Sequence, residues 1–189
     1  MTTVGSKHFE NRWRLSRAGM VNVWHYIDTE FTLSGGRLIL RGSNGSGKSR
    51  ALEMLLPFLL DADRRRMDAT GSQKVSLDEL MHTGIGNQTN RVGYLWLELT
   101  RPGEHLTLGA HIRYSASARR SEVHYFTTER RVGHDLKLVA DNRDPLARDQ
   151  LAELVGAHRH IRIARRARMR EPVRRAQSRP LAKRIPCCR

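Results

Sequence analysis

Residues 37–60 read RLILRGSNGSGKSRALEMLLPFLL, and this stretch gives the strongest indication of the fold. Inside it, residues 42–49 match the pattern G-x-x-x-x-G-K-[ST]. The glycines admit backbone torsions that other residues avoid, so the loop amides can turn inward and form a nest for an anion. The pattern therefore predicts a loop that binds the phosphates of a nucleotide.

Each position of the loop has a physical task in this interpretation. Lys48 is expected to reach the β- and γ-phosphates, and the Ser49 hydroxyl is expected to bind Mg²⁺. The N-terminus of the following helix adds partial positive charge. The predicted ligands are ATP and Mg²⁺; the alternative is a surface loop without a ligand. The predicted nucleotide-binding residues are Gly42, Ser43, Asn44, Gly45, Ser46, Gly47, Lys48 and Ser49.

The flanking residues predict a strand before the loop and a helix after it. Arg37–Arg41 is a compact apolar run, typical of a strand buried in a sheet. Ser49–Leu60 has helical spacing, and Pro57 should kink this helix or mark its last turns. The apolar face of the helix is predicted to consist of Leu52, Leu55, Leu56 and Leu59.

The rest of the chain is predicted to be rich in antiparallel β-structure. A turn is expected at Gly35-Gly36, and a short helix follows the capping pair Ser76 and Glu79. A second helix should start at Asp144-Pro145 and run to Val155, with Gly156 as its C-cap. The fold class is therefore α/β or α+β. Strands are expected near residues 12–17, 21–26, 30–33, 91–99, 105–114 and 122–128, with 135–139 as a candidate edge strand.

The positive charge is concentrated at the C-terminal end. Of the formal net charge of +15, residues 157–189 supply +11, from eleven Arg and one Lys against one Glu. The predicted organisation is a folded region, 1–156, followed by a disordered Arg-rich tail, 157–189. This tail is either a basic arm that binds DNA phosphates or the product of a frameshift in a GC-rich gene, and its position favours the frameshift.

Three features indicate a cytoplasmic protein without a membrane segment. No apolar run approaches about 18 residues, and the N-terminus has no apolar core typical of a secretory signal. The two cysteines, Cys187 and Cys188, are adjacent and form no disulfide framework.

Other candidate residues carry weaker signals, each with a simpler explanation. Glu98 is a candidate catalytic carboxylate, but on a half-buried strand it more often faces solvent. The run 64–66, three arginines, is a candidate DNA or nucleotide contact or else a solvated loop. Gln88 is a candidate Mg²⁺ ligand in a polar loop. His158 and His160 lack a partner cluster for a metal.

The Asn44-Gly45 pair inside the loop resembles the ABC-type ATPase heads of the SMC, RecF and SbcC group. The stretches RWRLSRAGMVNVW, LILRGSNGSGKSRALEMLLPFLLDADRRRMDAT and VGYLWLEL look like the start of large SMC-like proteins of bacterial defence operons, similar to the condensin-like subunit of Wadjet anti-plasmid systems. The resemblance covers about residues 10–156. It implies the N-terminal lobe of a split ATPase head, with ATP, DNA, a second head in a homodimer and defence-operon subunits as partners.

The chain also departs from that family pattern. It has no heptad-patterned coiled coil, no LSGG-like signature and no apolar run ending in Asp-Glu. The expectation is therefore an incomplete fragment that binds ATP but hydrolyses it weakly or not at all, so enzyme activity of the chain alone is left open. Two alternatives remain: a small stand-alone P-loop enzyme or kinase, and a basic DNA-binding protein that acts through its tail.

Overall fold

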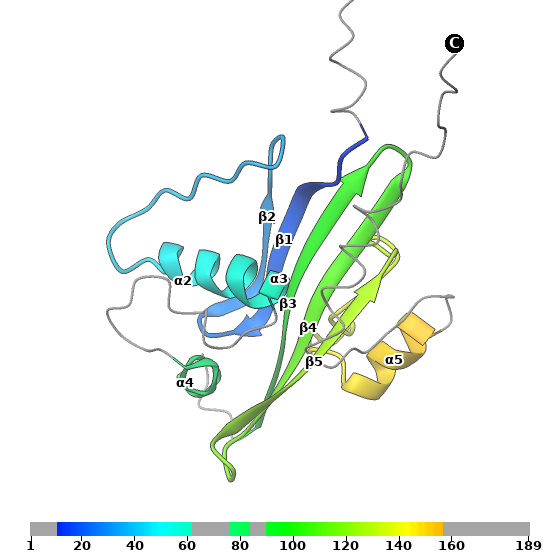
Figure 1. The fold of residues 1–189 in the computed structure, drawn as a ribbon. Helices are drawn as coiled ribbons and strands as arrows, with labels where there is room; N and C mark the ends of the chain where they lie inside the picture. Colours follow the sequence, from blue (N-terminus) through cyan, green and yellow to red (C-terminus); the bar gives the residue numbers. More distant parts are fainter. Residues whose placement is uncertain (1–10, 62–75, 84–89, 157–189) are drawn as a thin grey trace, which may run out of the picture.

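The computed structural model describes residues 11–61, 76–83 and 90–156 (Figure 1). Its centre is a five-stranded antiparallel sheet with strand order β2-β1-β3-β4-β5. The architecture is α+β, one of the two predicted classes. The strands are β1 (Arg14–Val23), β2 (Tyr26–Thr32), β3 (Asn90–Arg101), β4 (Glu104–Ser115) and β5 (Arg120–Thr128).

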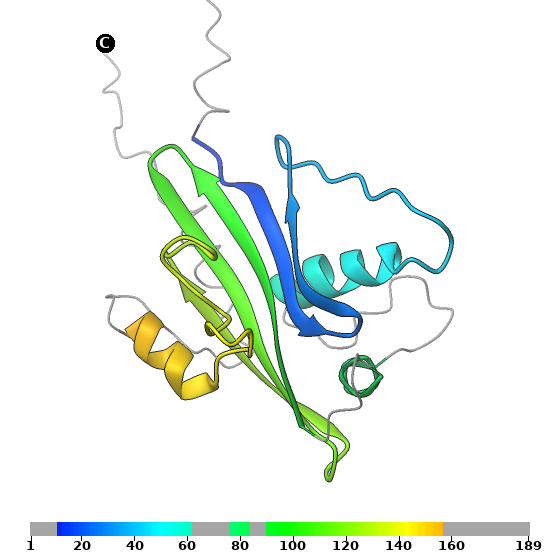
Figure 2. The ribbon, with the colours of Figure 1, turned by 180° about the vertical axis from the view of Figure 1, so that it is seen from behind.

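Helical segments cover both faces of the sheet (Figures 1 and 2). After the predicted phosphate loop, α2 (Lys48–Glu53), a π-helical turn η1 (Met54–Phe58) and α3 (Leu59–Asp61) follow without a break. Together with α4 (Leu77–His82) they pack on the first face, and α5 (Arg148–Gly156) packs on the second.

The antiparallel section confirms the sequence prediction closely. β3, β4 and β5 form a meander in continuous register, from Asn90 opposite Ser115 to Arg101 opposite Glu104. The even-numbered apolar residues of β4 share the first face, as their alternation predicts. Leu108, Ala110, Ile112 and Tyr114 are buried there against the helices.

In place of the three short strands expected near the N-terminus, the structure has two longer strands. β1 and β2 form a hairpin in which Val23 pairs with Tyr26, so Trp24 and His25 are the turn. The predicted turn at Gly35-Gly36 is present, with φ values of 60° and 80°. These positive φ values explain why glycine occupies both positions.

The predicted apolar face of the first helix is partly wrong. Leu52 is 37% exposed and Leu56 is half-buried, although Leu55 and Leu59 are buried as expected. The buried face is completed instead by Ala51, Met54 and Phe58. The π-helical turn changes the rotation per residue between Met54 and Phe58, so a face drawn with α-helical spacing drifts out of phase. Pro57, which has no backbone N–H to donate, lies within this turn.

The strand predicted at Arg37–Arg41 is absent. Only an isolated bridge joins Ser34 to Arg37, and Ile39 is 78% exposed. A strand requires a hydrogen-bonded neighbour, and among the described residues none runs beside this segment. The prediction of a buried strand is therefore wrong, and Leu40 is only partly buried against the core.

Two further boundaries differ from the prediction. Residues 135–139 form no strand; isolated bridges join Val132 to Leu136 and Val139 to Pro145. Because Pro145 is part of this pairing, α5 begins at Arg148 rather than at Asp144-Pro145. By contrast, the short helix α4 begins as predicted, with the Ser76 hydroxyl accepting a hydrogen bond from the Glu79 amide at 3.1 Å.

Glycines and aromatic rings alternate across the second face of the sheet. Gly19 pairs with Trp96, Trp96 with Gly109, and Gly109 with Phe126, so the row crosses four strands. A Cβ at Gly19 would lie 2.4 Å from the Trp96 ring, and one at Gly109 would lie 2.1 Å from the Phe126 ring. Each ring therefore occupies the space that a side chain at the neighbouring glycine would need, and both rings belong to the core cluster that includes Leu151 and Val155 of α5.

Replacing Gly109 with Ala should destabilise the fold, because the buried Phe126 ring has no free space to move into. We expect a loss of about 1–3 kcal/mol in the free energy of unfolding, measured by chemical denaturation. Adding Phe126→Leu to the same chain should recover part of this loss relative to the additive expectation. Additive or worse behaviour of the double variant would contradict the packing account.

Candidate functional site

The predicted phosphate-binding loop is a surface turn at the start of the helical segment 48–61. Residues 42–46 are exposed, and the Ser46 amide donates to the Ser43 carbonyl at 3.3 Å. Gly45 and Gly47 have φ values of 83° and 87°, in the left-handed region that glycine enters without strain. Gly47 is the N-cap of α2, and its carbonyl accepts the first helical hydrogen bond from Ala51 at 2.9 Å.

The Lys48 side chain folds back over this loop. Its ammonium donates to the carbonyl oxygens of Gly42 at 2.8 Å and Ser43 at 2.6 Å, and to the Ser46 hydroxyl at 3.2 Å. A cation is thereby held against the loop next to the amides of the helix N-terminus. Ser49, in the first turn of α2, is exposed beside it. The structure thus brings the motif's cation, hydroxyl and glycine turns together.

Two aromatic side chains from the β1–β2 hairpin contact the loop, and sequence reasoning missed both. The Tyr26 hydroxyl donates to the Gly47 carbonyl at 3.2 Å. A Cβ at Gly47 would lie 2.5 Å from the Trp24 ring and 2.9 Å from the Tyr26 hydroxyl. The position therefore requires glycine both for its φ value and for this close approach. Burial raises the pKa of Tyr26, so its hydroxyl is protonated and able to donate at neutral pH.

A buried arginine holds this aromatic turn in place. Arg91 of β3 is 3% exposed and donates to the Asn22 side-chain oxygen at 3.0 Å, the Trp24 carbonyl at 2.7 Å and the Met81 carbonyl at 3.4 Å. Asn22 and Trp24 have positive φ values of 49° and 51°, which non-glycine residues adopt only under local constraint. The sequence prediction places this turn inside a strand at residues 21–26, and the structure ends β1 at Val23 instead.

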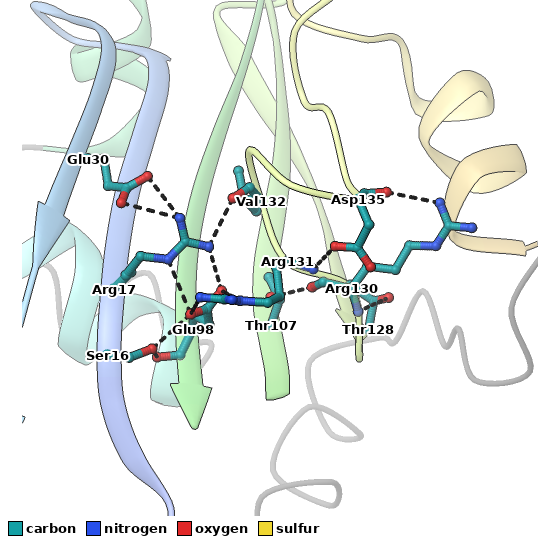
Figure 3. A network of polar contacts seen from close by, with 10 residues as sticks. All are labelled: Ser16, Arg17, Glu30, Glu98, Thr107, Thr128, Arg130, Arg131, Val132 and Asp135. Carbon is teal, nitrogen blue, oxygen red and sulfur yellow. Dashed lines mark hydrogen bonds and ion pairs between the residues drawn. The ribbon is translucent and has the colours of Figure 1, made fainter. Parts of the chain in front are cut away.

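Glu98 neither faces solvent, as its strand position suggested, nor lies near the phosphate loop. It is fully buried on the second face and accepts hydrogen bonds from Ser16, from Arg17 at 2.5 Å and from Arg131 at 3.2 Å (Figure 3). Arg17 also pairs with Glu30 at 3.2 Å and donates to the Val132 carbonyl. The network ties β1, β2 and β3 to the chain after β5, which is a structural task.

The charge state of Glu98 follows from two opposing effects. Burial by itself raises the pKa of its carboxyl, whereas hydrogen bonds from Arg17, Arg131 and Ser16 lower it by more. The net result is a pKa of about 2, so Glu98 is ionised at neutral pH. A carboxylate so fully occupied by donors is a poor general base.

His111 is a further buried titratable residue, and sequence reasoning did not single it out. It lies between the sheet and α5, with its ring centroid 5.3 Å from that of Tyr94. Burial lowers the pKa of His111 to about 4; electrostatic interactions with His124, Arg148 and Arg113 add to this lowering, and Glu122 opposes it. Its ring is therefore neutral at pH 7. Among the described residues, no group of three or more His, Cys, Asp or Glu side chains is arranged to hold a metal ion.

The remaining sequence candidates lie outside the described residues. These are the arginine run 64–66, Gln88, His158, His160, Cys187, Cys188 and the rest of the Arg-rich segment 157–189. Within the described ranges, none of the helices is both long and apolar enough to cross a membrane.

Comparison with known proteins adds no family assignment. No protein-family model matches the chain, and a search of curated proteins finds no match.

The Glu98 network should make stability fall in acid. Because the pKa of Glu98 is lowered from 4.5 to about 2 in the folded state, its contribution is present above pH 4.5 and is lost as the pH falls towards 2. That contribution is on the order of 3 kcal/mol. Glu98→Gln should destabilise the protein at pH 7 by about 3–5 kcal/mol and flatten the stability profile between pH 4.5 and 2.

Chemical denaturation at several pH values measures both effects. The matched control is Glu104→Gln. It breaks the ion pair between Glu104 and Arg101, in which the Glu104 side chain is 52% exposed. This control should cost at most about 1 kcal/mol. Equal losses for the two variants would contradict the assigned role of Glu98.

Proposed function

We propose that residues 42–49 bind ATP together with Mg²⁺, as the nucleotide-binding loop in the N-terminal lobe of an SMC-like ATPase head. The observation that carries the proposal is the Lys48 ammonium, held at 2.6–2.8 Å by two loop carbonyls beside the helix N-terminus. Such a group pairs with phosphate oxygens by charge-assisted hydrogen bonds. The amides of the glycine turns supply further donors, in line with an anion nest.

The residues present also fit a magnesium ion that arrives with the nucleotide. Mg²⁺ prefers hard oxygen ligands, retains several waters and binds mainly through substrate phosphates. One exposed protein hydroxyl next to the phosphate-binding lysine meets this requirement, and Ser49 provides it. When bound, the ion would neutralise phosphate charge, while Lys48 and the loop amides orient the phosphate chain.

The segment before the loop supports the view that this lobe belongs to a larger head. Apart from the bridge between Ser34 and Arg37, residues 37–41 have no strand partner among the described residues, and Ile39 is 78% exposed. A segment of this composition would complete its hydrogen bonds if another strand lay beside it. The proposal thus includes a cytoplasmic protein whose partners are a second lobe, a second head, DNA and other defence-operon subunits. In this account the chain alone binds ATP but turns it over weakly or not at all, because the water-orienting groups lie elsewhere.

Lys48→Ala should abolish or strongly weaken ATP binding to the full chain. Loss of a charge-assisted contact with phosphate predicts at least about tenfold weaker affinity, measured by isothermal titration. The control is Lys137→Ala. Lys137 is an exposed lysine that pairs with Asp141 and lies away from the loop, so this variant should bind ATP with wild-type affinity. Unchanged affinity in the Lys48 variant would refute the assignment of the loop.

Ser49→Ala should remove the magnesium dependence of binding. The wild-type chain is expected to bind ATP more tightly with Mg²⁺ than with a chelator present, since the Ser49 hydroxyl would supply a hard oxygen ligand for the ion. The variant should keep the chelator-level affinity and lose most of the gain from Mg²⁺. Ser117→Ala, in the β4–β5 turn, serves as the control. A full magnesium gain in the Ser49 variant would exclude Ser49 as the ligand.

A further inference from the structure

The contact between the β1–β2 hairpin and the phosphate loop has a specific geometry. The Tyr26 hydroxyl donates to the carbonyl of Gly47, the same carbonyl that accepts the first helical hydrogen bond from Ala51. The Gly47–Lys48 peptide unit is therefore fixed from two directions, by the helix and by β2. By contrast, the Gly42 carbonyl accepts from the Lys48 ammonium, and the Ser43 carbonyl accepts from the Lys48 ammonium and the Ser46 amide, so these contacts lie within the loop motif itself.

Fixing this carbonyl also fixes the amide on the other side of the same peptide bond. In a trans peptide the C=O and N–H groups point in opposite directions. With the Gly47 carbonyl directed along the helix and towards Tyr26, the Lys48 N–H points out of the helix N-terminus, towards the loop. The left-handed backbone of Gly47, φ 87° and ψ 0°, allows this orientation but does not by itself select it.

The hairpin is itself held rigidly enough to impose this orientation. Arg91 bonds to the carbonyl of Trp24 and to the side chain of Asn22, and the Asn22 amide donates to the Val92 carbonyl at 2.7 Å. The Trp24 and Tyr26 rings contact each other, with centroids 5.9 Å apart, and Trp24 closes the space against Gly47. The hydroxyl therefore reaches the loop from the sheet rather than from a flexible surface segment.

We propose that Tyr26 is a positioning residue for the phosphate loop, and that its hydroxyl sets the Gly47–Lys48 peptide so that the Lys48 amide faces the bound phosphate. This inference rests on the proposed function. Tyr26 acts on the phosphate chain through the backbone, so its effect should be the same for ATP and for a polyphosphate that has no base or sugar.

Tyr26→Phe in the full chain, titrated with inorganic tripolyphosphate and with ATP, tests the inference. We expect about two- to tenfold weaker binding of both ligands, by a similar factor, because one hydrogen bond that orients the loop is lost. The matched control is Tyr94→Phe, which removes a tyrosine hydrogen bond to a backbone carbonyl, that of Leu146, on the opposite face of the sheet. Tyr94→Phe should lower thermal stability without changing tripolyphosphate affinity.

The outcomes separate this inference from the proposed function. If the wild-type chain binds neither ligand, or Lys48→Ala binds as well as wild type, the proposed function fails and the role of Tyr26 fails with it. If Lys48→Ala loses binding but Tyr26→Phe retains wild-type affinity, only the inference is overturned. Equal weakening in Tyr26→Phe and Tyr94→Phe also overturns it, because that result reflects general destabilisation.

A second measurement needs no variant. In the wild-type chain, tripolyphosphate should shift the backbone amide resonances of Lys48 and Gly47 and the indole resonance of Trp24, whose ring contacts Gly47. Shifts confined to other parts of the chain would contradict the positioning role.

Discussion

The buried guanidinium of Arg91 is the constraint on which the geometry of the site depends. It is a cation in the core that donates to neutral oxygens of the β1–β2 turn and of α4, and burial lowers its pKa. Its hydrogen bonds offset the cost of desolvation and hold two non-glycine residues, Asn22 and Trp24, in left-handed backbone conformations. That turn sets where the Trp24 and Tyr26 rings contact the loop at residues 42–49.

The two faces of the sheet carry different tasks. The helical segment that begins at Lys48 packs on the first face. The hydrophobic core therefore fixes the orientation of the loop that precedes this segment. The second face carries the glycine–aromatic row and the ion pairs of Glu98, which join strands to α5 and the chain before it. A buried ion pair of this kind adds less to stability than an apolar pair of equal size, yet breaking it is costly. Here the pairs of Glu98 join β3 to Arg17 of β1 and to Arg131 in the chain after β5.

Sequence alone predicted the parts of the fold that depend on local patterns. The alternation along β4, the Gly35-Gly36 turn and the Ser76 cap are decided by neighbouring residues, and all three are confirmed. The burial of Glu98 depends on Arg17, 81 positions away, and no local pattern indicates such a partner. The motif residues of the loop form a local pattern, whereas Tyr26 contacts the loop from β2 and Arg91 holds the turn beside it, and no local pattern indicates either contact. The late start of α5 follows from the pairing of Pro145 with Val139, which the Asp-Pro signal for a helix start does not reveal.

A crystal structure of the full chain, grown with Mg²⁺ and a non-hydrolysable ATP analogue, would show whether the loop at residues 42–49 holds the phosphates of a nucleotide. We expect β- and γ-phosphate oxygens within hydrogen-bonding distance of the Lys48 ammonium and of the amides around Gly47, with Mg²⁺ on the Ser49 hydroxyl. A nucleotide bound elsewhere on the chain, with the loop unchanged, would contradict this expectation.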